Sequence, residues 1–198
     1  MSTDLKQTRR EQSHERILDA AARAICRDGY AGLGVANVMK EAGLTHGGFY
    51  AHFASRDDLL AAAVEHAGEQ SAARMRERLQ ARIAEGASPL RALVEEYLSE
   101  RHVEALDQGC PVAALGADLA RGEPALRQVA ERRVLHLAGA VERALPPRSA
   151  AGTGMVIAST LVGAVQIARV LQAEPRNAVL RSCRDALLAQ YDRPATAG

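Results

Sequence analysis

The residues with the clearest chemical potential form one short stretch in the first third of the chain. Gly47 and Gly48 lie inside a predicted helix of barely two turns, where each glycine costs about 1 kcal/mol relative to alanine. A helix whose first turn lacks side chains brings its backbone close to another surface, and its N-terminal amides suit an anion such as a phosphate. Helix stability does not explain these two glycines, whereas close contact with an anionic partner does.

The elements around these glycines indicate the kind of partner. A short helix with an apolar face over 35–42, a turn, and a second short helix capped by Thr45 and running to His52 follow the order of a helix-turn-helix. In that motif the second helix enters the major groove of DNA. The spacing also fits a plain loop between two packing helices, because helix-turn-helix periodicity is common in all-α domains.

The same stretch carries a specific resemblance to a known family. The matching residues are Gly29-Tyr30, Val38, Ala42-Gly43-Leu44-Thr45, Gly47, Phe49-Tyr50, His52-Phe53, Arg56 and Leu59. Together they resemble the N-terminal domain of the TetR-type (TetR/AcrR) helix-turn-helix transcriptional regulators, and the match is dense from about Arg16 to Val64. Beyond this stretch the resemblance is one of architecture, and it carries no information about a ligand.

The resemblance implies roles for individual residues. The residues implied to contact phosphates are Thr45, Tyr50, His52 and Arg56. The residues implied to face base edges are His46, Gly47 and Gly48. Phe49 and Phe53 are implied to be core residues. Two glycines depart from the family pattern, Gly34 where a threonine often caps the second helix and Gly48 where a hydroxyl residue is frequent. Sequence preference is therefore expected to rest on DNA shape and on few side chains, chiefly His46.

A basic group precedes the first predicted helix. Lys6, Arg9 and Arg10 fit an arm that reaches the DNA backbone or minor groove. They fit a solvated charged tail equally well, because Asp4 and Glu11 dilute the charge. The sequence leaves both interpretations open.

A candidate ligand or redox-sensing site lies where one predicted helix ends and the next begins, in the segment 107–111. Cys110 there places its sulfur at a helix N-terminus, where the helix dipole favours the thiolate form. Some regulators that this junction resembles sense oxidants or electrophiles through a cysteine, but a small hydrophobe that caps the helix is the simpler interpretation. Tyr97 and His102 complete this candidate site. The other two cysteines lie on apolar helical stripes and are expected to be inert: Cys26 and Cys183.

The motifs of other function classes are missing from the sequence. His102 and His136 lack the H-x-x-x-H spacing of helical metal ligands, and the three cysteines form no C-x-x-C pair. The chain contains no H-E-x-x-H, no G-x-S-x-G and no Walker loop. We therefore expect no metal, no cofactor and no enzymatic activity.

Hydrophobic periodicity is helical nearly everywhere, which predicts an all-α fold of about nine helices. Serine and proline signals mark helix starts at Ser55, Ser88-Pro89, Pro111, Pro124 and Pro175. The predicted division is a DNA-binding domain over 1–54, a ligand-binding and dimerisation domain over 55–192, and a frayed tail over 193–198.

The length and composition of the chain exclude some classes of protein. The 198 residues have a mass of 21.1 kDa, with 47% hydrophobic and 25% charged residues and a formal net charge of +1. These values exclude a large multidomain enzyme and a disordered chain, and they are silent on partners. The uncharged run over 149–168 is long enough to span a membrane, but its polar residues and the Arg169 that follows favour a helix buried in protein. Because no signal peptide is evident, we expect a cytoplasmic protein without membrane contact.

The resemblance implies a homodimeric regulator, most often a repressor, that leaves a palindromic operator when a small-molecule effector binds in the second domain. The predicted dimer contact uses the helices over 155–171 and 176–191, and the helix that starts at Ser55 is expected to transmit ligand binding. The alternative is an all-α ligand-binding or interaction module without operator binding. An enzyme that uses the helical cavity is a weaker third class.

Overall fold

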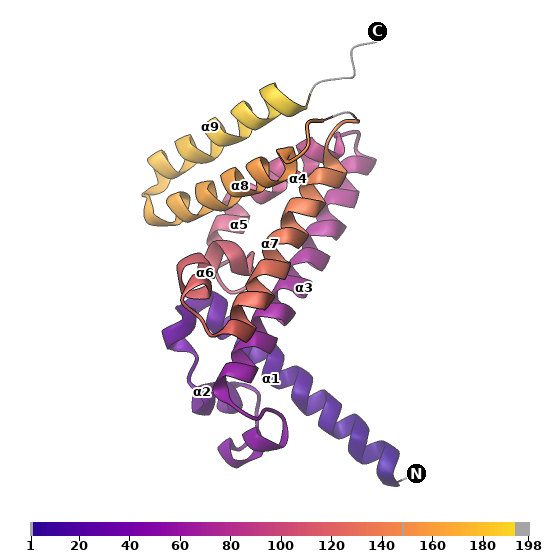
Figure 1. The fold of residues 1–198 in the computed structure, drawn as a ribbon, viewed down its shortest axis with the longest axis vertical. Coiled ribbons are helices and arrows are strands. Elements are labelled where there is room, and N and C mark those ends of the chain that lie inside the picture. The colour runs from indigo at the N-terminus through magenta and orange to yellow at the C-terminus, as the bar shows by residue number, and fades with distance from the viewer. Residues whose placement is uncertain (1, 148, 193–198) are drawn as a thin grey trace.

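The structure, a computed structural model, describes residues 2–147 and 149–192 (Figure 1). In that part of the chain it contains nine α-helices, one 3-10 helix and no strand, which confirms the predicted all-α fold. The elements are α1 (Ser2–Gly32), α2 (Val35–Glu41), η1 (His46–Ala51), α3 (Arg56–Ala84), α4 (Pro89–Tyr97), α5 (Glu100–Glu104), α6 (Pro111–Ala120), α7 (Pro124–Ala144), α8 (Thr153–Val170) and α9 (Ala173–Tyr191). The predicted tail over 193–198 lies outside the described residues.

Local capping chemistry starts several helices where it was predicted. The hydroxyl of Ser55 accepts from the backbone N–H of Asp58 at 3.0 Å, and that of Ser88 accepts in the same way from Arg91 at 3.0 Å. Each bond satisfies an amide that has no partner inside its helix. The last helix differs from the prediction, because α9 begins at Ala173 and holds Pro175 within its first turn, where a missing N–H costs nothing.

The first helix is longer at its N-terminal end than predicted. It continues to Ser2, and Figure 1 shows this end extending away from the body of the molecule. The segment taken as an arm or tail is therefore a helix. At the other end the prediction is confirmed, because Gly29 leaves the helical conformation with φ +74° and ψ −173°, and only a short helical piece follows to Gly32.

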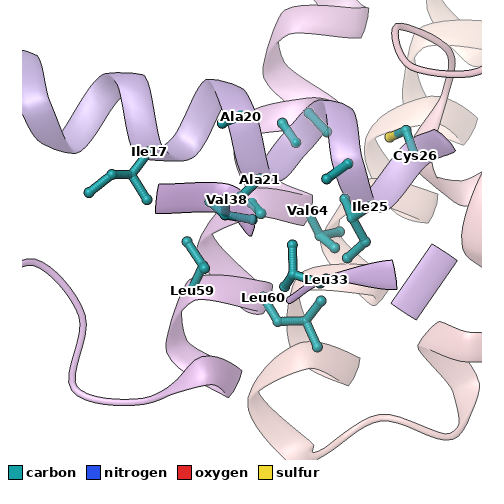
Figure 2. Packing of buried hydrophobic residues seen from close by; sticks show 14 of the residues in the cluster. Ile17, Ala20, Ala21, Ile25, Cys26, Leu33, Val38, Leu59, Leu60 and Val64 are labelled. Atoms are coloured by element: carbon teal, nitrogen blue, oxygen red, sulfur yellow. The ribbon is translucent and has the colours of Figure 1, made fainter. Parts of the chain in front are cut away.

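Two hydrophobic cores hold the helices together. The first joins α1, α2 and η1 to the N-terminal half of α3, and Figure 2 shows Ile17, Ala21 and Ile25 of α1 facing Leu60 and neighbouring residues of α3. This core also contains residues of α6 and the start of α7. The second core lies among α4, α8, α9 and the rest of α7. The predicted domain boundary after residue 54 therefore falls inside the first core.

Helix α8, whose only charged residue is Arg169 in its last turn, is buried on one side only. Its length and hydropathy are sufficient for a membrane span, but 44% of its residues are buried inside the protein. Ile157, Leu161 and Val165 lie in the second core, whereas Val170 is 83% exposed. The sequence predicted a helix buried in protein. The structure buries one face of α8 and leaves its opposite, apolar face on the surface.

Candidate nucleic-acid interface

The glycine-containing element η1 is a 3-10 helix rather than the predicted α-helix. Its last turn is closed by hydrogen bonds from the backbone N–H groups of His52 and Phe53 to the carbonyl of Phe49. Thr45 occupies the N-cap position in an extended conformation, but its side chain makes no capping hydrogen bond, so the predicted cap is wrong. The first-turn amides keep no side-chain partner, and an alanine Cβ at Gly47 would meet nothing within 4 Å. The backbone of η1 is open to an incoming surface.

Stacked rings anchor η1 to the body of the domain. Phe49 is buried and its ring centroid lies 5.9 Å from that of Phe53, which in turn stacks on His14 of α1 at 4.8 Å. Both phenylalanines belong to the first core, which confirms the prediction for them. Phe49 is the buried residue of η1, and Phe53 follows directly after the helix, so the other side of η1 faces outward.

Four of the predicted DNA-contacting residues lie together on this outer surface: Thr45, His46, Gly47 and Tyr50 are all exposed. Tyr50 is 74% exposed although it is a large aromatic residue, and its ring meets only the edge of Phe49, at 5.2 Å between centroids. An exposed tyrosine beside open backbone amides is suited to phosphate contact. Gly48 is half-buried, with the methyl group of Met39 and the Thr45 hydroxyl near its Cα.

His52 lies at the edge of this surface and is half-buried. Its Nδ1 is enclosed and has no hydrogen-bond partner, and its ring lies 5.8 Å from that of His14. Burial, followed by the neighbouring His14 and Arg10, lowers the pKa of His52. At neutral pH the ring is therefore uncharged, so a contact with phosphate would be a neutral hydrogen bond.

Arg56 is placed differently from the prediction. Its Nε donates to the carbonyl of Leu33 at 3.0 Å and its Nη2 to the carbonyl of Tyr30 at 2.8 Å, and its guanidinium lies 4.8 Å from the centre of the Tyr30 ring. These contacts close the turn that follows α1. Two of the five N–H donors of the guanidinium are thus used within the domain, by acceptors 23 and 26 residues earlier in the chain.

Arg10 has a contact that sequence reasoning missed. Its Nη2 donates to the carbonyl of Ala51, the last residue of η1, at 2.9 Å. The extended N-terminal half of α1 therefore caps the C-terminal end of η1 and places a positive charge beside the exposed surface. The basic residues near the N-terminus were the only signal, and they could not reveal a helix or its partner.

A second candidate site is a cavity of about 290 Å³ among α3, α4, α6 and α7. Tyr97 and Cys110, both predicted, lie in its wall beside aliphatic residues such as Leu79 and Leu137. Tyr97 is 3% exposed, and its buried hydroxyl has no oxygen or nitrogen partner and interacts only with the Cys110 thiol. Burial, and then the neighbouring Cys110 thiol, raise the pKa of Tyr97 well above its ordinary value, so the hydroxyl keeps its proton.

His102 does not line this cavity. Its Nδ1 lies 2.7 Å from the carbonyl of Tyr97, and its Nε2 accepts from the backbone N–H of Cys110 at 3.2 Å. These partners fix the neutral tautomer with the proton on Nδ1. Burial lowers the pKa of His102. The residue links the end of α4 to the start of α6, which is a structural role instead of the predicted ligand contact.

Cys110 occupies the N-cap position of α6 without a side-chain capping bond. Its predicted role as a sensor stays a prediction. Cys26 is buried as expected, and this burial raises the pKa of its thiol to about 11. Among the described residues, no group of three or more histidine, cysteine or acidic side chains is placed to hold a metal ion.

Comparison with known proteins identifies the N-terminal part of this architecture. Residues 17–63 match the sequence profile described as bacterial regulatory proteins of the tetR family. This segment of the chain belongs to that family. A TetR-family chain is a DNA-binding transcriptional regulator, and the family consists of regulators rather than enzymes. Residues 17–63 include α2, η1 and the Tyr50 surface described above.

Relatives extend the TetR-family match over most of the chain. The HTH-type transcriptional regulator Rv0196 of Mycobacterium tuberculosis, itself described as uncharacterised, is 29% identical over 191 residues, covering 89% of this chain and 94% of its own. The HTH-type transcriptional regulator LmrA of Bacillus subtilis is 28% identical over 160 residues, covering 77% of this chain and 81% of its own.

Solved structures show the same fold. A TetR transcriptional regulator from Chloroflexus aurantiacus superposes with a TM-score of 0.75 at 22% identity, covering 93% of this chain and 98% of its own. The reduced form of NemR from E. coli gives a TM-score of 0.76 at 18% identity, covering 93% and 100%. The second domain of this TetR-family chain thus has the family architecture despite its divergent sequence.

Proposed function

We propose that this TetR-family regulator is a homodimeric repressor, located in the cytoplasm, that leaves a palindromic operator when a small molecule binds the cavity between α3, α4, α6 and α7. The observation that carries the proposal is the exposed surface of η1, formed by Thr45, His46, Gly47 and Tyr50 over a firmly anchored inner face. Open backbone and an exposed tyrosine suit phosphates, and His46 is the side chain available for base readout.

Two helices support a coupling between the cavity and this surface. The middle of α3, from Gly68 to Leu79, forms one wall of the cavity, while its first turns pack in the first core through Leu59 and Val64. The helix α6 begins at the cavity and places Leu115 and Leu119 in the same core. A ligand that shifts either helix therefore acts on the packing that holds η1.

The surface of α8 and α9 supports the dimer. Val156, Ile167 and Val170 are 56%, 54% and 83% exposed and lie at helical spacing on one face of α8. An alanine Cβ at Gly163, on the same helix, would meet nothing within 4 Å, so a second copy can approach closely there. An isologous contact through this face would set two η1 elements one DNA turn apart, about 34 Å.

From the spacing of small residues in α8, Gly154, Ala158, Gly163 and Ala164 would be expected to let two helices approach closely, but they divide between two faces. Gly154 packs inside the monomer, where its N–H donates to Glu142 at 2.8 Å and a Cβ would lie 2.7 Å from the carbonyl of Ala138. Ala158 and Ala164 are likewise buried, which corrects their predicted role.

The experiment is a gel retardation assay with purified protein and a palindromic segment from the region upstream of its own gene. We expect retardation of this segment and none of a scrambled segment of the same composition, and the complex should weaken steeply with salt because phosphate contacts release counterions. Retardation of both segments alike, or of neither, would favour the module without operator binding.

A further inference from the structure

The wall of the cavity carries one sign of charge. It includes Arg76, Arg133, Arg143 and His136, and no aspartate or glutamate contributes to it among the described residues. The chain as a whole is balanced, with 25 basic and 24 acidic residues, so its composition does not explain this asymmetry. Most of the remaining wall is apolar. An amphipathic anion is the ligand class that complements such a site.

Two buried donors in this wall lack an oxygen or nitrogen acceptor. The hydroxyl of Tyr97 interacts only with the neighbouring Cys110 thiol, a weak partner, and the residue is 3% exposed. The Nε of Arg133 is equally enclosed and unpartnered, on a side chain that is only 12% exposed. Buried donors without acceptors are costly in a folded protein, and a ligand oxygen would satisfy them.

Arg133 also carries charge that the protein neutralises only in part. Its Nη2 lies 2.7 Å from one oxygen of Glu65, and the other oxygen of the same carboxylate pairs with Arg132 at 3.1 Å. One carboxylate thus serves two guanidinium groups. The absence of a side chain at Gly68 on α3 makes room for Arg133, because a Cβ there would lie 2.3 Å from the Arg133 Cδ. The Arg133 side chain therefore packs closely against the backbone of α3.

We propose that this cavity binds an organic carboxylate with an apolar body, its oxygens accepting from Arg133 Nε and from the Tyr97 hydroxyl, and its body lying against the aliphatic wall. The inference rests on the proposed function, because the same cavity is assigned there to the effector. A volume of about 290 Å³ is at the small end of ligand sites. It suits one ring with a short chain and excludes large polycyclic compounds.

The test compares three probes of nearly equal shape by isothermal titration calorimetry with the full chain: 4-phenylbutyrate, 4-phenylbutanamide and 4-phenylbutylamine. We expect the carboxylate to bind roughly tenfold or more tightly than the neutral amide, because charge-assisted hydrogen bonds are the stronger ones. The cationic amine should be the weakest. Equal affinity for acid and amide, preference for the amine, or no binding of the acid at millimolar concentration would each overturn the proposal.

Variants locate the carboxylate. Arg133→Gln should reduce the affinity for 4-phenylbutyrate to that for the amide, and Tyr97→Phe should weaken it several-fold. The matched control is Arg132→Gln, which removes the other, 56% exposed partner of Glu65 and should leave the affinity within about twofold. Circular dichroism checks folding, and Arg133→Lys, which keeps charge without the Nε donor, replaces Arg133→Gln if that variant unfolds. An unchanged affinity for 4-phenylbutyrate in the Arg133 variant that remains folded contradicts the assignment. Since no DNA is present, these results are independent of the retardation assay.

Discussion

The guanidinium of Arg56 holds the end of α1 through the carbonyl oxygens of Leu33 and Tyr30. Arg56→Ala should therefore lower the free energy of unfolding by about 1–3 kcal/mol, because two charge-assisted hydrogen bonds and a cation–π contact are lost. Urea denaturation measures this change. Arg127→Ala is the control, since Arg127 is exposed and its side chain has no interaction among the described residues. Equal stability of the two variants would return Arg56 to a role in DNA contact alone.

Tyr50 and His46 share the exposed surface of η1, but we expect them to act differently. Tyr50→Phe should weaken binding to all DNA sequences to a similar degree, because phosphate contacts position the protein without reading sequence. His46→Ala should instead change the ranking of operator variants. Titrating both proteins against a set of operators with single base changes measures the difference. Parallel losses on every operator would show that His46 does not read bases.

His102 makes folding sensitive to acid. Its pKa is lowered in the folded state, chiefly by burial, so the unfolded chain takes up the proton more readily. Its stabilisation is complete above the ordinary pKa of about 6.5 and is lost as the pH falls through the lower folded-state value. Protonation would also turn Nε2 from an acceptor into a donor facing the Cys110 N–H.

Thermal unfolding between pH 7.5 and 5 tests this expectation. The wild-type melting temperature should fall on acidification, and His102→Gln should flatten part of that fall while lowering stability at pH 7.5. His136→Gln, at an exposed position on α7, should keep the wild-type profile. If the His102 variant follows the same curve as the wild type, the acid sensitivity has another origin, with His52 the next candidate because its pKa is also lowered by burial.

At the scale of elements, η1 combines weak local stability with an open face. Gly47 has negative φ and free space around its Cα, so Gly47→Ala should raise the free energy of unfolding by about 0.5–1 kcal/mol. The same methyl group stands on the exposed surface and should lower operator affinity, because it separates backbone from DNA. Denaturation and gel retardation assays on one preparation should show a higher free energy of unfolding together with a lower operator affinity. A variant that gains stability and keeps full affinity would place the DNA contact elsewhere.

The elements that could be predicted from sequence are those whose ends are set by neighbouring residues. Ser55 and Ser88 cap helices through amides three positions away, and Gly29 breaks α1 by its own backbone conformation. The surface of η1 could be predicted for the same reason, since Phe49 in η1 and Phe53 just after it are close in sequence and both lie in the first core.

Features that depend on distant parts of the chain could not be predicted. The donors of Arg56 are claimed by residues 23 and 26 positions earlier, and Arg10 meets Ala51 across 41 positions. The cavity is built by four helices, and its charge depends on which faces of α3 and α7 meet. Periodicity marks Arg133 as polar, but only packing shows that its Nε is enclosed.

For the whole molecule, the exposed apolar face of α8 predicts a dimer. Val170→Glu should convert the dimer to monomer, because a charge within an apolar contact is strongly unfavourable, while an 83% exposed position leaves the monomer fold intact. Sedimentation measures the mass. Leu135→Glu, on α7 and 55% exposed, is the matched control and should remain dimeric. Val162 on the same helix is unsuitable for this test, since it packs against the second core.

The first core also bears on how such regulators can be recombined. Leu115 and Leu119 of α6 and Leu126 of α7 pack with α1 and α3. The hydrophobic core of the DNA-binding domain therefore includes residues that lie more than 50 positions after residue 54, the predicted end of that domain. A chimera that joins residues 1–54 to the second domain of another regulator would place this apolar surface against side chains that do not pack well with it. New specificities are therefore more readily obtained by changing the few exposed residues of η1 than by exchanging residues 1–54 as a block.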